Sequence, residues 1–250
     1  MITPLELAVE MASKAGEIIK NYFGQKLKRH IKGSGANDFA TDADLRSEAY
    51  IIEQIQINFP EDGIIAEEKG LLKTIDAKNI WIIDPLDGTH NFTHGVKDCG
   101  VMIARITEDK VQLSVLYNPF KDMLVTAQRN KGVFVNGQRK HINLDKTQDL
   151  SIIADDNGFA PILKKQDFIV SDRWSCVDNA LSIVSQENNA YFNKTAKIWD
   201  LSPISLCFEE YGLCVMGSGQ KPYQWDSGIQ TLIAIPQSKL LQIREILERK

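Results

Sequence analysis

Two aspartates stand three residues apart in the most informative segment of the chain, which runs from Trp81 to Thr89 as Trp-Ile-Ile-Asp-Pro-Leu-Asp-Gly-Thr. The apolar residues predict a buried strand that ends in Asp84. Pro85 then predicts a turn, so the carboxylates of Asp84 and Asp87 can face one point beyond the strand. Gly88 follows at once and predicts the start of a helix, whose free N–H groups suit a phosphate. The segment therefore predicts a cation site beside an anion site.

Further carboxylates lie at the ends of other predicted elements. Glu67 and Glu68 close the preceding strand, and adjacent strand residues point to opposite faces, so we expect only one of them to bind a metal directly. We assign that role to Glu67. Glu68 is expected to lie behind the ligands without touching the metal. Asp42 and Asp44 precede an early helix and Asp200 precedes a late one, positions at which carboxylates are well tolerated.

Each of these carboxylates also has an ordinary structural explanation. Asp-Pro and Asp-Gly are common in turns, Asp42 and Asp200 are typical helix caps, and Glu67-Glu68 is compatible with a solvated loop. Together, however, carboxylates that end two buried strands would repel each other unless a cation neutralised them. An all-oxygen acidic site favours Mg²⁺, with Mn²⁺ as a substitute, over zinc, which prefers sulfur and imidazole.

The elements that must position these groups fall into two parts. A capping box of Thr3 and Glu6 predicts a first helix to about residue 23, and apolar residues at helical spacing predict a second helix from about residue 45 to Pro60. Strands are expected at 64–66 and 80–83, followed by an antiparallel meander at 101–106, 111–117, 123–126 and 132–135. Short strands and helices then alternate. They are expected at 150–154, 177–185, 190–192, 201–211 and 232–235, and a last helix follows. We place the boundary near residue 146, with an α+β metal-binding domain over 1–145 and an α/β domain that contributes to substrate binding over 146–250.

The composition is that of a globular protein, with 250 residues of which 43% are hydrophobic and 25% are charged. A net charge of −4 disfavours nucleic-acid binding and requires a local cation to attract an anionic substrate. The four scattered cysteines predict reduced thiols without metal-site spacing. No signal segment is visible, and no apolar stretch approaches the roughly 20 residues of a membrane span, so we expect a cytoplasmic protein without membrane contacts.

The segment from Trp81 to Phe92 resembles the Asp-Pro-[Ile/Leu]-Asp-Gly-Thr signature of the inositol monophosphatase family, one of the lithium-sensitive, metal-dependent phosphatase families. Ala66-Glu67-Glu68 is similar to the family's Gly-Glu-Glu segment, Ala40-Thr41-Asp42 to its Thr-Asp segment, and Trp199-Asp200 to its later Trp-Asp. The four blocks occur in family order. The resemblance covers most of the chain to about residue 145 and implies an α+β fold, the layered αβαβα sandwich of inositol monophosphatases and fructose-1,6-bisphosphatases, and a homodimer.

The same resemblance implies two or three Mg²⁺ ions. The first ion would be bound by Glu67, Asp84, the Leu86 carbonyl and Thr89. The second would be bound by Asp84, Asp87 and Asp200. A weaker third ion would use Glu67 and reach Asp42 through water, and Li⁺ would inhibit by competing at the second position.

Catalysis, on this resemblance, is the attack of a metal-activated water on a phosphomonoester. Asp42 and Thr89 would position and deprotonate the water, with Glu67 contributing through its metal. The amides of Gly88 and Thr89 would bind the phosphate, and Asp87 and Asp200 would border the substrate. Lys32 lies where the family has a lysine near the substrate. No covalent protein nucleophile is required.

The C-terminal half departs from the family pattern and leaves the substrate open. Asn193 occupies the position, seven residues before Asp200, where inositol phosphatases usually have a glutamate that binds inositol hydroxyls; an amide can still bind a polyol, but without charge. Trp174 and Tyr191 are more typical of a core than of a substrate platform. A polyol or sugar phosphate of the inositol-1-phosphate type is favoured. The alternatives are fructose-1,6-bisphosphate, histidinol phosphate or a 3′-phosphoadenosine nucleotide and, from another class, a regulatory binding role, since some bacterial relatives contact the transcription machinery.

Overall fold

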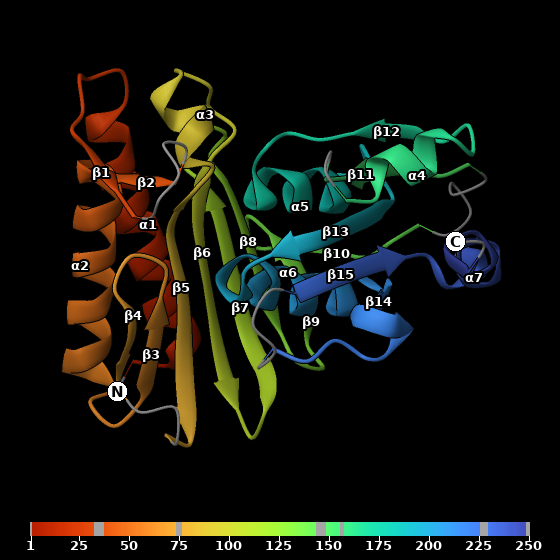
Figure 1. Ribbon diagram of the computed structural model, residues 1–250. Helices are drawn as coiled ribbons and strands as arrows, with labels where there is room; N and C mark the ends of the chain where they lie inside the picture. Colours follow the sequence, from red (N-terminus) through yellow and green to blue (C-terminus); the bar gives the residue numbers. More distant parts are fainter. Residues whose placement is uncertain are drawn as a thin grey trace.

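Helices and β-sheets alternate in five layers in the computed structural model of the protein (Figure 1). The structure describes residues 2–32, 38–73, 77–143, 149–155, 158–225 and 230–248. Two helices cover the outer face of a large sheet, two more lie between it and a smaller sheet, and the last two cover the far face of the smaller sheet. The layered αβαβα fold expected from the sequence is confirmed.

The outer helices beside the large sheet are α1 (Pro4–Tyr22) and α2 (Asp42–Asn58). The capping box of Thr3 and Glu6 starts α1 as predicted, and its buried face packs on the sheet and on α2. A second capping box, of Thr41 and Asp44, starts α2 three residues earlier than predicted. Asp42 and Asp44 therefore lie inside the first turn of α2.

The large sheet has the strand order β10-β9-β8-β7-β6-β5-β3-β4 in the described part of the chain. Its strands are β3 (Gly63–Ala66), β4 (Gly70–Lys73), β5 (Asn79–Asp87), β6 (Gly100–Thr107), β7 (Lys110–Asn118), β8 (Met123–Gln128), β9 (Gly132–Val135) and β10 (Gln138–Lys140). All neighbours are antiparallel except β3 and β5, whose C-terminal ends therefore meet at one edge. The predicted meander is confirmed.

Pro85 does not end its strand, contrary to the expectation of a turn. β5 continues to Asp87 because a register shift against β6, between Asp84 and Asp87, accommodates the residues that do not pair. A proline lacks the N–H of a ladder bond, so it is tolerated at such an irregularity. Ser47 of α2 donates a 2.9 Å hydrogen bond to the Pro85 carbonyl and so ties the distorted strand to the outer helix.

Two short elements flank this edge of the large sheet. A ribbon of β1 (Arg29–Ile31) and β2 (Phe39–Thr41) leads directly into α2. The short helix α3 (Thr89–Thr93) follows β5, so a helix does start after Gly88 as predicted, but it is only five residues long.

The layer between the sheets contains α5 (Cys176–Val184) and α6 (Ile198–Tyr211). The smaller sheet has the order β12-β11-β13-β15-β14 and consists of β11 (Ser151–Ala154), β12 (Ile169–Ser171), β13 (Ala190–Ala196), β14 (Cys214–Met216) and β15 (Gln230–Ile235). Its outer face is covered by α4 (Ala160–Lys164) and α7 (Leu240–Glu248). The predicted boundary near residue 146 lies outside the described residues, and the smaller sheet begins at Ser151.

All four cysteines carry free thiols, as expected, and Cys99 and Cys207 are buried. Within the described ranges, every helix is too short or too polar to cross a bilayer.

Candidate active site

Four carboxylates from three separate parts of the chain meet where β3 and β5 end and α6 begins. Burial, and then the charges of Glu67, Asp87 and Asp200, raise the pKa of Asp84 well above its ordinary value. Burial, and then Asp87 and Glu67, raise the pKa of Asp200 to about 8. Carboxylates perturb one another in this way only at short range. The structure therefore brings together the four carboxylates that were predicted as ligands.

Asp87 is held by the first turn of α5, which belongs to the other half of the chain. The Ser175 hydroxyl donates to Asp87 Oδ2 at 2.5 Å, and the amides of Cys176 and Val177 donate to its two oxygens at 3.0 and 2.9 Å. Burial still raises the pKa of Asp87 to about 6, although these donors lower it. Ser175 was not among the residues predicted for the site; its sequence signal is that of a helix N-cap, and nothing local indicates which carboxylate it meets.

Asp200 is the third residue of α6 and belongs to the cap of that helix. Its Oδ2 accepts a 2.7 Å hydrogen bond from the Lys197 amide. A helix N-terminus favours a carboxylate at this position, which orients the side chain at the cluster.

Thr89 places its hydroxyl between Asp44 and the Leu86 carbonyl. Its Oγ1 lies 2.9 Å from Asp44 Oδ1 and 3.0 Å from the Leu86 oxygen. Thr41 donates to the other oxygen of Asp44, from its amide at 2.8 Å and from its hydroxyl at 2.5 Å. Burial raises the pKa of Asp44 to about 6. Asp44 is thus a buried acceptor beside Thr89, a role that was not predicted from the sequence.

Asp42 lies away from Thr89, which corrects the expectation that these two residues act together. Its Oδ1 lies 2.9 Å from His30 Nε2, and its side chain is 41% exposed. Residues two positions apart in a helix are separated by about 200° around its axis, so Asp42 and Asp44 point to opposite sides. The structure pairs Thr89 with Asp44 instead.

Glu67 and Glu68 both face Lys32, which corrects the expectation that they point to opposite faces. Lys32 Nζ lies 2.8 Å from Glu67 Oε1 and 2.5 Å from Glu68 Oε1. β3 ends at Ala66, so the two glutamates stand in a turn where strand alternation no longer applies. Burial and the charge of Glu67 raise the pKa of Glu68 to about 8. Lys32 lies beside a predicted ligand, and so at the site.

Gly88 makes the sharp connection between β5 and α3. Its φ is +78°, and a Cβ here would lie 2.8 Å from the Asp98 carbonyl oxygen, so a side chain does not fit. Asn91, one turn later, donates at 2.8 Å to the carbonyls of Asp98 and Arg173. The backbone of Gly88 and Thr89 is therefore held rigidly beside the carboxylates.

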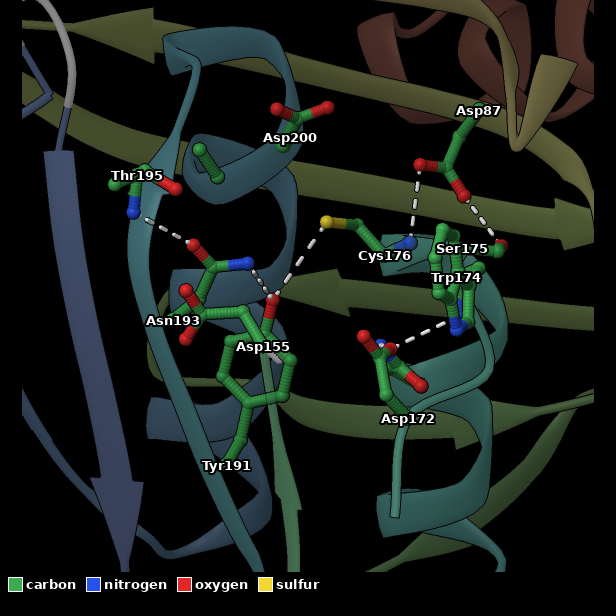
Figure 2. Close-up of a pocket in the computed structure, with 12 residues that line it drawn as sticks. Asp87, Asp155, Asp172, Trp174, Ser175, Cys176, Tyr191, Asn193, Thr195 and Asp200 are labelled. Atoms are coloured by element: carbon green, nitrogen blue, oxygen red, sulfur yellow. Dashed lines mark hydrogen bonds between the residues drawn. The ribbon is translucent and has the colours of Figure 1, made fainter. Parts of the chain in front are cut away.

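A cavity of about 270 Å³ opens beside Asp87 and Asp200 (Figure 2). The rest of its lining comes from the C-terminal half: Asp155, Asp172, Trp174, Ser175, Cys176, Asn179, Tyr191, Asn193, Thr195 and Ala196. Asn193, predicted to contact substrate, lies in this wall, where its amide donates to the Tyr191 hydroxyl at 3.3 Å and accepts from the Thr195 amide at 3.1 Å.

Trp174 is not a core residue, contrary to expectation. It is 63% exposed at the rim of the cavity, whereas Tyr191 is 1% exposed and belongs to the core as expected. Trp174 lies between an exposed strand and the buried helix α5. Its apolar side chain therefore did not show whether the residue is buried or exposed.

The donor set fits a hard divalent cation. Asp87, Cys176 and Asp200 offer ligand atoms that lie within 4.8 Å of one another. Burial, Asp200 and Asp87 raise the pKa of the Cys176 thiol well above its ordinary value, which leaves the carboxylate oxygens as the ligands. Buried carboxylates that repel one another are stabilised by bound Mg²⁺, which takes oxygen ligands.

The sequence model of the inositol monophosphatase family matches residues 3–247. The chain belongs to the inositol monophosphatase family. Within the family, it is 31% identical to the Nus factor SuhB of Haemophilus influenzae over 83% of this chain and 82% of that one. It is 28% identical to the histidinol-phosphatase of Chlorobaculum parvum over 86% and 85% of the two chains. An inositol monophosphatase/NADP phosphatase, solved in complex with Mg²⁺ and phosphate, shares the fold with a TM-score of 0.85 at 21% identity, over 98% of this chain and 95% of that one.

Proposed function

We propose that the protein is a Mg²⁺-dependent phosphomonoesterase that hydrolyses a small phosphorylated metabolite. The observation that carries the proposal is the meeting of Glu67, Asp84, Asp87 and Asp200 next to a cavity of about 270 Å³. Membership of a family that contains phosphatases supports it.

The four carboxylates would hold the ions. Glu67, Asp84, the Leu86 carbonyl and Thr89 would bind one, and Asp84, Asp87 and Asp200 a second. Bound Mg²⁺ would lower the pKa of a coordinated water and offset the negative charge of the phosphoryl group and the leaving oxygen. A third ion that reaches Asp42 through water stays a prediction.

We assign removal of the proton from the attacking water to Thr89 and Asp44. The Thr89 hydroxyl has one hydrogen, and the carboxylate of Asp44 is a stronger acceptor than the Leu86 carbonyl. Because Thr89 donates that hydrogen in its bond to Asp44, the Thr89 oxygen can accept a hydrogen bond from water. A pKa of about 6 suits Asp44 to accept a proton near neutral pH. The amides of Gly88 and Thr89 would bind the phosphate.

The two halves of the chain would divide the work. Residues 1–145 would supply most of the metal ligands and the proton acceptor, while residues 146–250 would supply Asp200 and the pocket for the leaving group, which includes Asn193. The candidate substrates are inositol 1-phosphate, fructose-1,6-bisphosphate, histidinol phosphate and a 3′-phosphoadenosine nucleotide. We expect a homodimer, which sedimentation would test.

The test is the release of phosphate from these four esters with Mg²⁺ and with EDTA. We expect release from at least one ester that requires Mg²⁺, is lost in the Asp84→Asn variant and falls in millimolar Li⁺. Hydrolysis that persists in EDTA would contradict the proposal.

A regulatory role is the second candidate, because the relatives include a Nus factor SuhB. It would be favoured if the chain binds Mg²⁺ but releases no phosphate from any ester tested.

A further inference from the structure

The cavity carries two acidic side chains that the proposed metal sites do not use. Asp155 directly follows β11 and Asp172 directly follows β12. These strands are parallel neighbours, so their C-terminal ends bring the two carboxylates to the same edge of the smaller sheet. Burial raises the pKa of Asp155, and Asp172 adds to that rise, so the two charges act on each other. Figure 2 shows Asp155 beside Asn193 and Asp172 below Trp174.

No ion pair joins Asp155 or Asp172 to a basic side chain within the ranges that the structure describes. Among the described residues, Asp172 accepts hydrogen bonds from two neutral groups, the Trp174 amide and the Asn179 side chain, both at 2.9 Å. Asp155 accepts a 3.4 Å hydrogen bond from the Phe159 amide, and its buried Oδ2 has no partner among the described residues. Backbone amides of Phe159 and Lys194 stabilise the Asp155 carboxylate, but no positively charged side chain among the described residues neutralises this wall.

The nearest arginine in the sequence does not change this charge. Arg173 directs its guanidinium to Asp178 at 3.3 Å and to Glu187, and it is absent from the lining of the cavity. The described lining contains no lysine or arginine at all.

Trp174 adds an aromatic face at the rim of the same cavity. Its φ is +57°, which is unusual for a bulky residue and is held by the hydrogen bond from its amide to Asp172. Trp174 as a whole is 63% exposed although it stands beside a pocket. An indole face attracts cations, most strongly where water is excluded.

We propose that the alcohol released by the enzyme carries a positively charged amine, which Asp155, Asp172 and Trp174 bind. The inference rests on the proposed phosphomonoesterase function. Water adds to phosphorus, the bond between phosphorus and the alcohol oxygen breaks, that oxygen takes up a proton, and the products are inorganic phosphate and an amino alcohol. A neutral polyol could donate hydrogen bonds to the two carboxylates but would leave their charges uncompensated, and a second phosphate would be repelled by them.

The experiment compares 3-aminopropyl phosphate with n-butyl phosphate, two esters with the same number of non-hydrogen atoms that differ in the charge at the far end. Both are assayed with saturating Mg²⁺ for phosphate release. We expect kcat/KM to favour the amine by at least about tenfold, with the difference mainly in KM, because the interaction is made at a distance from the reacting atoms. The preference should shrink as ionic strength rises.

Three variants locate the effect. Asp155→Asn and Asp172→Asn keep a side-chain oxygen acceptor and remove one charge each, so each should reduce several-fold the ratio of kcat/KM for 3-aminopropyl phosphate to kcat/KM for n-butyl phosphate. Asp167→Asn is the matched control, since Asp167 is exposed in the same half and does not line the cavity, and it should leave the preference unchanged.

The outcomes separate the two proposals. Hydrolysis of both esters at equal kcat/KM, with no effect of either variant, would overturn the amine preference and leave the phosphomonoesterase intact. An equal loss for both esters in the variants would assign Asp155 and Asp172 a structural role and also overturn it. If neither ester nor any ester of the wider panel is hydrolysed with Mg²⁺, the proposed function itself fails, and the amine preference fails with it.

Discussion

Thr89 donates a 2.9 Å hydrogen bond to the carboxylate of Asp44, a buried residue in the first turn of α2. The bond joins the segment after β5 to the outer helix layer and places a hydroxyl and a proton acceptor next to the carboxylate cluster. Asp42, two residues earlier, contacts His30 and is partly exposed. This difference between two neighbouring aspartates can be tested directly.

Asp44→Asn should lower kcat by about 10²- to 10⁴-fold, the usual contribution of a positioned acid or base, and should change KM little. Asp42→Asn serves as the matched control and should stay within a few-fold of wild type. Steady-state kinetics with saturating Mg²⁺ measures both. Equal losses in the two variants would show that the Thr89 contact is not what distinguishes them.

Asp84→Asn should abolish most of the activity and weaken the binding of Mn²⁺, because Asp84 is the ligand expected to be shared by two ions. Electron paramagnetic resonance measures the Mn²⁺ binding. The same change should raise the melting temperature in EDTA, since it removes a buried charge that three neighbouring carboxylates repel. Asp109→Asn, an exposed turn position, is the control. If the variant melts at a lower temperature than wild type in EDTA, Asp84 stabilises the metal-free fold and is not destabilised by its neighbouring carboxylates.

The stability of the metal-free protein should decrease as pH rises from about 4 to 8. The ordinary pKa of an aspartate is 3.8, and in the folded protein burial and its neighbours raise the pKa of Asp200 to about 8. Between these values the folded state binds more protons than the unfolded chain, so the free energy of unfolding falls with pH, and the loss levels off above pH 8. Melting curves in EDTA from pH 5 to 8 should show this trend, and saturating Mg²⁺ should abolish or reverse it. A melting temperature in EDTA that climbs over this range would contradict the repulsion.

Lys32→Gln should tighten the binding of divalent ions at Glu67. Burial alone would lower the pKa of Lys32, but Glu67 and Glu68 raise it overall, so the ammonium stays charged and occupies the carboxylates. An incoming cation must displace it, which costs part of the binding energy. Titration with Mn²⁺ should give a several-fold lower Kd in Lys32→Gln, with Lys26→Gln, in a loop of the same half, as the control. An unchanged or weaker affinity would mean that Lys32 does not compete with the metal.

Local patterns in the sequence were sufficient to predict much of the fold and the identity of the proposed ligands. The capping box at Thr3, the apolar periods of the helices and the meander were correct because they depend on neighbouring residues. Asp84, Asp87 and Glu67 could be named because acidic residues end two predicted buried strands, and the structure shows that these strands run parallel, with their C-terminal ends together. Pro85 was misjudged because the register shift that accommodates it is a property of the pairing with β6, not of β5 alone.

What the sequence by itself determined is therefore the set of acidic groups and the elements that carry them. Only the tertiary structure decided which of these groups face one another. Both aspartates suit a helix start equally well. Asp44 rather than Asp42 meets Thr89 because the direction of α2 against the sheet turns one side of its first turn toward Thr89. Asp87 meets Ser175, 88 positions later, only because α5 packs between the two sheets. Contacts of this kind depend on the packing of whole layers, and no pattern of neighbouring residues records them.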